Sequence, residues 1–464
     1  MLRLPATRRE FLCSSLALAA GSAVPCWFAD GRVRAAETPS RHDRRRVGAI
    51  GVGGRGTYVA QWAAKFGDIV AVCDADLAHA DAARAAFHGK PDVYQDYRRL
   101  LDRKDIDVIV NATPDHWHTL INIAACRSGR DVYAEKPLTL TIDEGKRLCK
   151  VVEETGRIVQ VGTMQRSDRP FQTAVELVRN GRIGKLKQVW VALPYYTAQG
   201  GPFPTEPVPK TLDWDLYQGQ APQHPYCRQR THSNFRWWYE YAGGIITDWG
   251  NHHVDIAHWG MNCERTGPIS VEARGLFPNP AGPQYYNTPD RFFSRMKYVH
   301  GVEVLYFSAL NERARFGDVG RHENTPPAKM AWLFGQDVPG EIRKFARDGI
   351  MFIGDQGRVF VNRGGVYGKA VDELKENPLP AGAWRVYPST DHMGNFFDCV
   401  RTRKPPCAPV QVEHRTVTAC HLTNLSIRLG RTIAWDPQGQ QVVGDEEANR
   451  WQTRPQRAPY LSRG

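Results

Sequence analysis

A glycine-rich turn between two apolar runs limits what this chain can fold into more than any other feature. The branched, apolar residues 46–50 lead directly into Gly51-Val52-Gly53-Gly54-Arg55-Gly56, after which a helix is expected as far as Phe66. A second apolar run, residues 68–73, ends at Asp74, an acid 18 residues past the last glycine. Strand, GxGxxG turn, helix, strand and acid in this order predict a dinucleotide-binding βαβ unit.

Each residue of this unit has a physical task in holding the ligand. Gly51 permits the tight turn, Gly53 lets the backbone approach a pyrophosphate at the helix N-terminus, and Gly56 allows helix and strand to pack closely. Asp74 is expected to accept hydrogen bonds from the ribose hydroxyls, and since Asp76 adds a second acid, the extra phosphate of NADP would be repelled. The sequence therefore favours NAD over NADP as the cofactor, bound by Gly51, Gly53, Gly54, Arg55, Gly56 and Asp74.

Helical and strand patterns continue to alternate after Asp74. Helices are expected at 78–87, 97–101, 118–126 and 141–155, and strands at 93–94, 107–111, 131–134 and 157–162. This rhythm predicts an α/β fold with a doubly wound parallel sheet, whose ligands lie beyond the carboxyl ends of the strands. Two loops that leave those ends carry further residues expected to contact the cofactor: Thr113, Pro114, His116, His118, Glu135 and Lys136.

Lys136 is the first candidate for catalysis. It follows a strand end and precedes Pro137, so it is expected to reach the nicotinamide edge, hydrogen-bond a substrate hydroxyl and stabilise developing negative charge. The alternative is a surface lysine in a turn. The bond between Lys136 and Pro137 is one of the few that can adopt the cis form.

The second candidate group lies in residues 243–255. Asp248 and His252 are four residues apart, so on a helix they share one face, and the imidazole is expected to act as a general acid or base with a pKa near neutral. Asp248 would bind substrate or orient that imidazole. Asp255 adds another acid, but the spacing of this group is unconvincing for a metal, and no metal site is expected. A histidine that only satisfies core backbone groups is the alternative.

An aromatic segment, residues 234–241, precedes this group and holds five aromatic side chains among eight residues. Flat aromatic faces stack on sugar rings, although a packed core segment would have the same composition. The residues expected to contact substrate are Gln165, Arg166, Trp237, Trp238, Tyr239, Asp248 and His252, with His224 as a weaker candidate.

These motifs occur in an order that resembles the Gfo/Idh/MocA oxidoreductases, a Rossmann-fold family that acts on sugars and cyclitols. The likeness extends over residues 46–435 and rests above all on Glu135-Lys136-Pro137 and on the Asp248…His252 helix. It implies a C-terminal α+β domain with a large, open, mostly antiparallel sheet, and it places Lys136, Asp248 and His252 around the reacting carbon. Some exported relatives are oxidoreductases, whereas others are glycosidases that use NAD without net redox change.

Residues 1–36 have the layout of an export signal. A basic start ending in Arg8-Arg9 is followed by a mildly apolar stretch, residues 11–24, and by small residues at 35–36 where a peptidase could cut. Residues 7–12 resemble the twin-arginine signal, which carries folded proteins across a bacterial membrane. The segment predicts a periplasmic protein that meets the twin-arginine machinery with its cofactor already bound. An ordinary basic N-terminus and a retained membrane anchor are the alternatives.

The length of 464 residues allows two or three domains. We expect an NAD-binding domain at 45–165, a substrate-binding domain at 166–435 that also offers contacts between copies of the chain, and a tail at 436–464 without clear periodicity. In the second domain, strands are expected at 187–194, 269–274, 302–310 and 358–361, and helices that return to the sheet at 392–400 and 415–429. Insertions at 197–225, 275–290 and 311–348 are expected to form the walls of the substrate cleft.

Composition argues against several other classes of protein. The net charge is +12, but the basic residues are scattered, so nucleic acid is not expected as a partner. The ten cysteines show no zinc-binding spacing, and pairing between Cys399 and Cys407 stays open.

Three functions fit these residues. The first is an NAD-dependent dehydrogenase or reductase of a sugar, sugar derivative or cyclitol, in which Lys136 and His252 handle the hydroxyl proton. The second is an NAD-dependent glycoside hydrolase, which needs an additional base such as Tyr239, Tyr241 or His253. The third is a non-catalytic sugar-binding protein that keeps NAD as a structural group, and the intact Lys136 and His252 argue against it.

Overall fold

The computed structural model describes residues 44–308, 332–333, 339–342 and 348–460. The predicted export signal and most of the insertion at 311–348 lie outside these residues. Within the described ranges, no helix combines the length and the apolar character needed to cross a bilayer. The eight cysteines described there, Cys399 and Cys407 included, are all free thiols.

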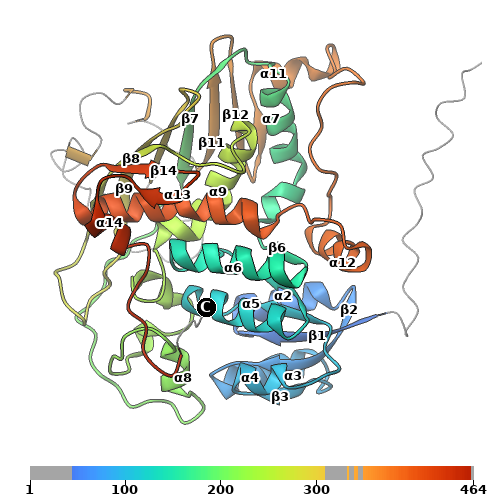
Figure 1. The fold of residues 1–464 in the computed structure, drawn as a ribbon, viewed down its shortest axis with the longest axis vertical. Helices are drawn as coiled ribbons and strands as arrows, with labels where there is room; N and C mark the ends of the chain where they lie inside the picture. Colours follow the sequence, from blue (N-terminus) through green and yellow to red (C-terminus); the bar gives the residue numbers. More distant parts are fainter. Residues whose placement is uncertain (1–43, 309–331, 334–338, 343–347, 461–464) are drawn as a thin grey trace, which may run out of the picture. The chain divides into compact units, whose positions relative to one another are not determined.

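The first sheet is fully parallel and has the strand order β3-β2-β1-β4-β5-β6 (Figure 1). Its strands are β1 (Arg45–Ile50), β2 (Gly67–Cys73), β3 (Asp92–Tyr94), β4 (Val108–Asn111), β5 (Asp131–Ala134) and β6 (Val159–Val161). The helices between them are α2 (Gly54–Ala63), α3 (Leu77–Ala86), α4 (Tyr97–Leu101), α5 (Asp115–Arg127) and α6 (Ile142–Thr155). The predicted doubly wound parallel sheet is thereby confirmed.

The second sheet is mixed, with the order β13-β12-β11-β7-β10-β9-β8-β14-β15. Its strands are β7 (Leu186–Leu193), β8 (Ser270–Leu276), β9 (Arg291–Lys297), β10 (Glu303–Ser308), β11 (Gly349–Gly354), β12 (Arg358–Asn362), β13 (Gly365–Tyr367), β14 (Ile433–Asp436) and β15 (Gln441–Val442). Among the described strands, β7 and β10 pair in parallel and the other neighbours pair antiparallel. The expected large, mostly antiparallel sheet is thus confirmed.

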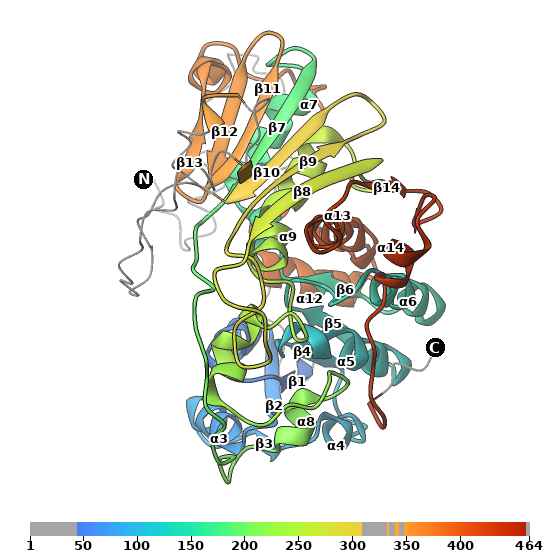
Figure 2. The ribbon, with the colours of Figure 1, turned by 90° about the vertical axis from the view of Figure 1, so that its left-hand side faces the viewer.

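Helices α9 (Ile245–Met261) and α13 (Val410–Leu429) pack against each other and against this sheet. Helix α13 also contacts α6 of the first domain, and Figure 2 shows it beneath β8 and β14. Its Val410 and Val417 are buried in the core of the first domain, whereas Ala419 and Leu422 are buried in the core of the second. One helix therefore holds both domains in a fixed relation, which matters because the site described below takes residues from each.

The other helical elements precede, separate or follow the strands of the second sheet. They are η1 (Met164–Ser167), α7 (Arg169–Arg179), α8 (Trp214–Gln218), η2 (Arg228–Arg230), η3 (His232–Trp237), α11 (Lys369–Asp372), η5 (Glu373–Lys375), α12 (His392–Thr402) and α14 (Glu446–Arg450).

The sequence predicted that the helix at 392–400 returns to the second sheet, and this prediction was wrong for α12. Its apolar residues Met393, Phe396 and Phe397 pack into the core of the first domain, beside Val47 and Tyr133. The apolar spacing predicts an amphipathic helix correctly, but a spacing does not say which of two sheets the apolar face will cover.

Candidate active site

A cavity of about 500 Å³ opens beyond the carboxyl ends of β4 and β5. Its lining includes residues from the first domain, from α9, from the segment around η3 and from the turn between β12 and β13. Seven residues predicted from the sequence are among those that line it: Arg55, Thr113, Glu135, Lys136, Trp237, Asp248 and His252.

Lys136 and Asp248 form an ion pair across this cavity. The Lys136 ammonium contacts the Asp248 carboxylate and also donates a hydrogen bond to its backbone oxygen, at 3.3 Å. Arg236 approaches the same carboxylate, with Nε 3.5 Å from Oδ2. Burial alone would raise the pKa of Asp248, but the two cations outweigh it and lower the pKa to about 2. Asp248 is therefore ionised and holds the ammonium in place.

His252 lies one turn along α9 from Asp248 and is only 4 % exposed. Burial, Lys136 and Arg363 lower the pKa of its imidazole well below the usual value. The expected pKa near neutral was therefore wrong, because burial first and the neighbouring cations second disfavour the charged form of the ring. Among the described contacts, none joins the imidazole to Asp248, and its Nδ1 is buried without a partner. The ring is therefore neutral, and no hydrogen bond within the described residues occupies its other nitrogen, Nε2, so we take Nε2 as the candidate proton acceptor.

The loop that carries Lys136 is fastened to the glycine turn. Arg55 donates two hydrogen bonds to Glu135, from Nε at 3.0 Å and from Nη2 at 2.8 Å. The peptide bond between Lys136 and Pro137 is cis. The ring nitrogens of His118 lie 2.6 Å from the Pro137 carbonyl oxygen and 2.8 Å from that of Thr113. His118 therefore braces the two strand-end loops against each other.

His116, predicted to contact the cofactor, is fully buried, and its Nε2 lies 2.9 Å from the Tyr217 carbonyl oxygen. It contacts the connection that leads to α9, and it does not line the cavity. Like His118, it supports the walls of the site from behind.

Asp74, predicted to bind the adenosine ribose, lies with three other residues predicted to contact the cofactor in a second, narrower pocket, which we call the adenosine pocket. Gly51, Asp74, Thr113 and Pro114 line it with the side chain of Tyr217 and others from the α8 segment. Gly51 has φ +77°, and a Cβ there would lie 2.5 Å from the Thr113 nitrogen. A Cβ on Gly56 would lie 1.8 Å from the Gly51 oxygen. Only glycine fits at either position, so the turn has the shape that a bound dinucleotide requires.

Three residues expected to contact substrate do not line the first cavity: Arg166, Trp238 and Tyr239. Arg166 is 3 % exposed and forms ion pairs with Asp255, at 2.6 Å, and with Glu264, at 2.8 Å. Trp238 is fully buried, with the Arg230 guanidinium 3.7 Å from its ring centre.

Tyr239 lies between Arg428 and Arg454, which are 3.3 and 3.7 Å from the ring centre. The Tyr239 ring is thus held by two guanidinium groups, since a polar side chain beside an aromatic cluster can complete a core as readily as a binding site. Gln165 is buried beside His252 and Arg363; with its amide group turned to match them, it donates to the His252 carbonyl oxygen at 2.9 Å and accepts from Arg363 Nε at 3.2 Å.

Several lining residues were not predicted. Asp115 is buried, and its burial, reinforced by the charge of Asp248, raises its pKa to about 8. Asp115 directly follows Thr113 and Pro114 in the loop after β4, so an acidic residue at this position could have been recognised from the sequence. Arg363, which stacks over Trp249 at 4.4 Å, comes from a hairpin turn of the far sheet, and no local pattern points to it. Tyr196 completes this wall.

A Rossmann sheet whose strand-end loop carries Lys136, facing the same cavity as His252 of α9 and followed by a mostly antiparallel sheet, is the architecture of an NAD-dependent oxidoreductase. Residues 45–163 match the Gfo/Idh/MocA model described as "Oxidoreductase family, NAD-binding Rossmann fold". Residues 185–305 and 354–462 match the model described as "Oxidoreductase family, C-terminal alpha/beta domain". These matches cover most of the chain, which therefore belongs to the Gfo/Idh/MocA family of oxidoreductases.

The individual relatives are named for different activities. The chain is 26% identical over 313 residues to a scyllo-inositol 2-dehydrogenase (NAD(+)) of Bacillus subtilis, covering 67% of this chain and 72% of the relative. It is 35% identical over 153 residues to an alpha-N-acetylgalactosaminidase of Shewanella oneidensis, but that match spans 30% of this chain and 33% of the relative. The solved WlbA dehydrogenase of Bordetella pertussis, in complex with NADH and UDP-GlcNAcA, shares the fold with a TM-score of 0.58 at 18% identity, covering 85% of this chain and 99% of that one.

Proposed function

We propose that this protein transfers a hydride between NAD and a secondary hydroxyl or keto group of a sugar, sugar derivative or cyclitol. The observation that carries the proposal is the convergence of Lys136, Asp248 and His252 on one polar cavity beside the glycine turn. The match to an inositol dehydrogenase supports the class of substrate. A cavity of about 500 Å³ has room for a pyranose or cyclitol ring beside a cofactor ring.

The side chains divide the chemistry between them. When bound, NAD supplies the hydride acceptor or donor. The Lys136 ammonium donates a hydrogen bond to the substrate oxygen and stabilises the negative charge that develops there as the hydroxyl loses its proton. Neutral His252 accepts that proton during oxidation and returns it during reduction. Asp248 keeps the ammonium positioned, and the guanidinium groups of Arg236 and Arg363 offer further donors to ring hydroxyls.

The long connection between β7 and α9, which reaches over to the first domain, supports a tightly held cofactor. The backbone of residues 209–213 is joined to the start of α3, since Leu77 N donates to Thr211 O at 2.9 Å and Asp213 N donates to Ala75 O at 2.9 Å. Tyr217, a few residues on, lines the adenosine pocket. Because this fastened segment supplies a wall of that pocket, we expect release of the nucleotide to be slow.

Purification without added nucleotide tests the proposal. We expect stoichiometric NAD or NADH in the acid-released supernatant, and formation of a keto product from at least one member of a panel of aldoses, inositols and sugar acids. Protein that contains no nucleotide and takes up none would contradict the proposal.

A redox-neutral glycosidase is the second candidate, favoured by the match to the galactosaminidase. Such an enzyme needs a further base near the carbon that loses a proton. Tyr239 is pinned between two arginines, and Tyr241 and His253 are fully buried, so the three bases expected for this task do not reach the cavity. Tyr196 lines the cavity and is the side chain that could serve. Release of a nitrophenol from glycosides without added NAD would favour this candidate over a net dehydrogenase.

Export by the twin-arginine route is part of the proposal. A tightly bound nucleotide is what such a protein needs, because little free NAD is available outside the cytoplasm. Replacing Arg8 and Arg9 by lysine should leave the protein in the cytoplasm with its nucleotide content unchanged, as cell fractionation would reveal. Unaltered periplasmic delivery of that variant would contradict the route.

A further inference from the structure

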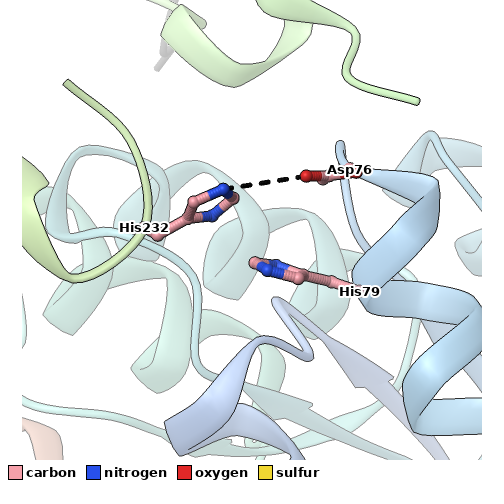
Figure 3. A group of neighbouring side chains, drawn as sticks. All are labelled: Asp76, His79 and His232. Carbon is pink, nitrogen blue, oxygen red and sulfur yellow. Dashed lines mark ion pairs between the residues drawn. The ribbon is translucent and has the colours of Figure 1, made fainter. Parts of the chain in front are cut away.

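Three side chains with metal-binding chemistry meet beside the glycine turn, outside the catalytic cavity (Figure 3). Asp76 precedes α3 and His79 lies in its first turn, whereas His232 begins η3 on the long connection from the second domain. One ligand atom of each residue lies within 4.8 Å of the other two. Asp76 Oδ2 is 3.7 Å from His232 Nε2, and the two imidazole rings are 4.3 Å apart at their centres.

The surroundings fix these groups in place. The other carboxylate oxygen of Asp76 caps α3 by accepting a hydrogen bond from Ala78 N at 3.0 Å, which leaves Oδ2 for the cluster. Asp74 Oδ2 lies 3.7 Å from His79 Nδ1, and a carboxylate behind an imidazole is the usual support of a metal-binding histidine. His232 has φ +53°, a left-handed conformation that side chains other than glycine rarely adopt. Histidine is one of the few residues besides glycine that tolerate this conformation, so the turn can hold the ring at this position.

We propose that Asp76, His79 and His232 bind a divalent transition metal ion, with Zn²⁺ as the best match. Two imidazole nitrogens and one carboxylate oxygen suit zinc, whereas Mg²⁺ and Ca²⁺ prefer ligand sets made of oxygen alone. Three protein ligands would leave an open coordination position. The side chain of Asp76 is 9 % exposed and those of His79 and His232 are 31 % and 44 % exposed, so an ion can enter from solvent.

An ion at this site would clasp the connecting segment to the first domain. The same segment is already joined to the start of α3 through Thr211 and Asp213, and it supplies Tyr217 to the adenosine pocket. A bond from His232 through the ion to α3 would close this connection at a second point. Bound zinc would therefore slow the release of NAD, a consequence that rests on the proposed function, whereas zinc binding itself does not.

Zinc titration of the full-length protein tests the site directly. The protein is purified with its bound nucleotide, stripped with EDTA, and titrated with Zn²⁺ by calorimetry, with bound metal measured after equilibrium dialysis. We expect one zinc per chain, bound about 10-fold or more weakly after His79→Gln or His232→Gln. His88→Asn is the matched control, because it removes an exposed histidine beyond the end of the same helix and asparagine tolerates the φ of +59° there. Circular dichroism would verify that each variant is folded.

Zinc binding that is unchanged in both cluster variants would overturn the site, as would the absence of uptake at about 100 µM Zn²⁺. Nucleotide release is then compared with Zn²⁺ and with EDTA. We expect the nucleotide to leave more slowly with Zn²⁺ than with EDTA, and this difference to be lost in His232→Gln. Equal release rates with Zn²⁺ and EDTA in the wild type would overturn the proposed effect of zinc on nucleotide release. Protein that binds zinc but contains no nucleotide would count against the proposed function and not against the metal site.

Discussion

The ammonium of Lys136, on the loop after β5, contacts the carboxylate of Asp248 in the first turn of α9. The pair joins the dinucleotide-binding domain to the second domain inside the cavity where substrate is proposed to bind. Because Asp248 is ionised and buried, it fixes the position of a charge that the proposed reaction needs.

Replacing Lys136 by alanine should lower turnover by about 100-fold or more, because the substrate oxygen loses the charge that stabilises it as its proton leaves. The nucleotide content should stay near normal, since the glycine turn and Asp74 are untouched. Lys104→Ala is the control, an exposed lysine that precedes β4 at the opposite end of the sheet. Turnover close to wild type in the Lys136 variant would remove this residue from the mechanism.

Two adjacent histidines should respond in opposite ways to substitution. His252→Ala should reduce turnover by about 100-fold or more with little change in thermal stability, since its Nδ1 has no partner to lose. His253→Ala should destabilise the fold by about 1–3 kcal/mol, because His253 is fully buried and bonds to the Ala192 carbonyl oxygen at 3.1 Å. Steady-state kinetics and denaturant unfolding of both variants measure the contrast. If His252→Ala loses stability and keeps activity, the assignment of the two residues is reversed.

Arg166 should prove to be a structural residue. Its replacement by alanine would leave the buried carboxylate of Asp255 without its partner, at a cost of about 3–5 kcal/mol. Substrate affinity of the folded fraction should be unchanged, since Arg166 does not line the cavity. A higher KM with normal stability would instead return it to the substrate site.

Local elements of the fold could be predicted from the sequence, whereas the roles of side chains such as His253 and Arg166 could not. The glycine turn, the helix at 97–101 and the strand at 131–134 could be predicted because each is encoded locally. Strand β9 could not, since its sequence RFFSRMK interrupts the apolar pattern with charges.

The partners of a side chain are harder still to predict than its element. Arg363 reaches the cavity from a hairpin of the second sheet, and Arg166, Trp238 and Tyr239 turn to other charged and aromatic groups. Such choices depend on contacts between segments that are distant along the chain.

Asp115 should make stability depend on pH. Its pKa is raised from 3.8 to about 8 in the folded chain, so the folded state holds a proton that the unfolded state releases. Stability from this group is therefore present at low pH and is lost as the pH rises between these two values, by up to about 1.4 kcal/mol per pH unit. Asp115→Asn should remove that slope and unfold at higher denaturant than wild type at pH about 8. Parallel profiles for the two proteins would show that Asp115 is ionised in the folded state.

The central claim is hydride transfer between bound NAD and a carbohydrate hydroxyl under the control of Lys136 and His252. The most direct measurement is single-turnover mixing of protein loaded with NAD⁺, the hydride acceptor, with candidate polyols, followed by the near-ultraviolet absorbance of reduced nicotinamide. With a true substrate, a rapid rise is predicted in the wild type, and a rise slowed by about 100-fold or more in Lys136→Ala and in His252→Ala. A wild-type rate in both variants, or no change in the nicotinamide with any sugar or cyclitol, would contradict the account.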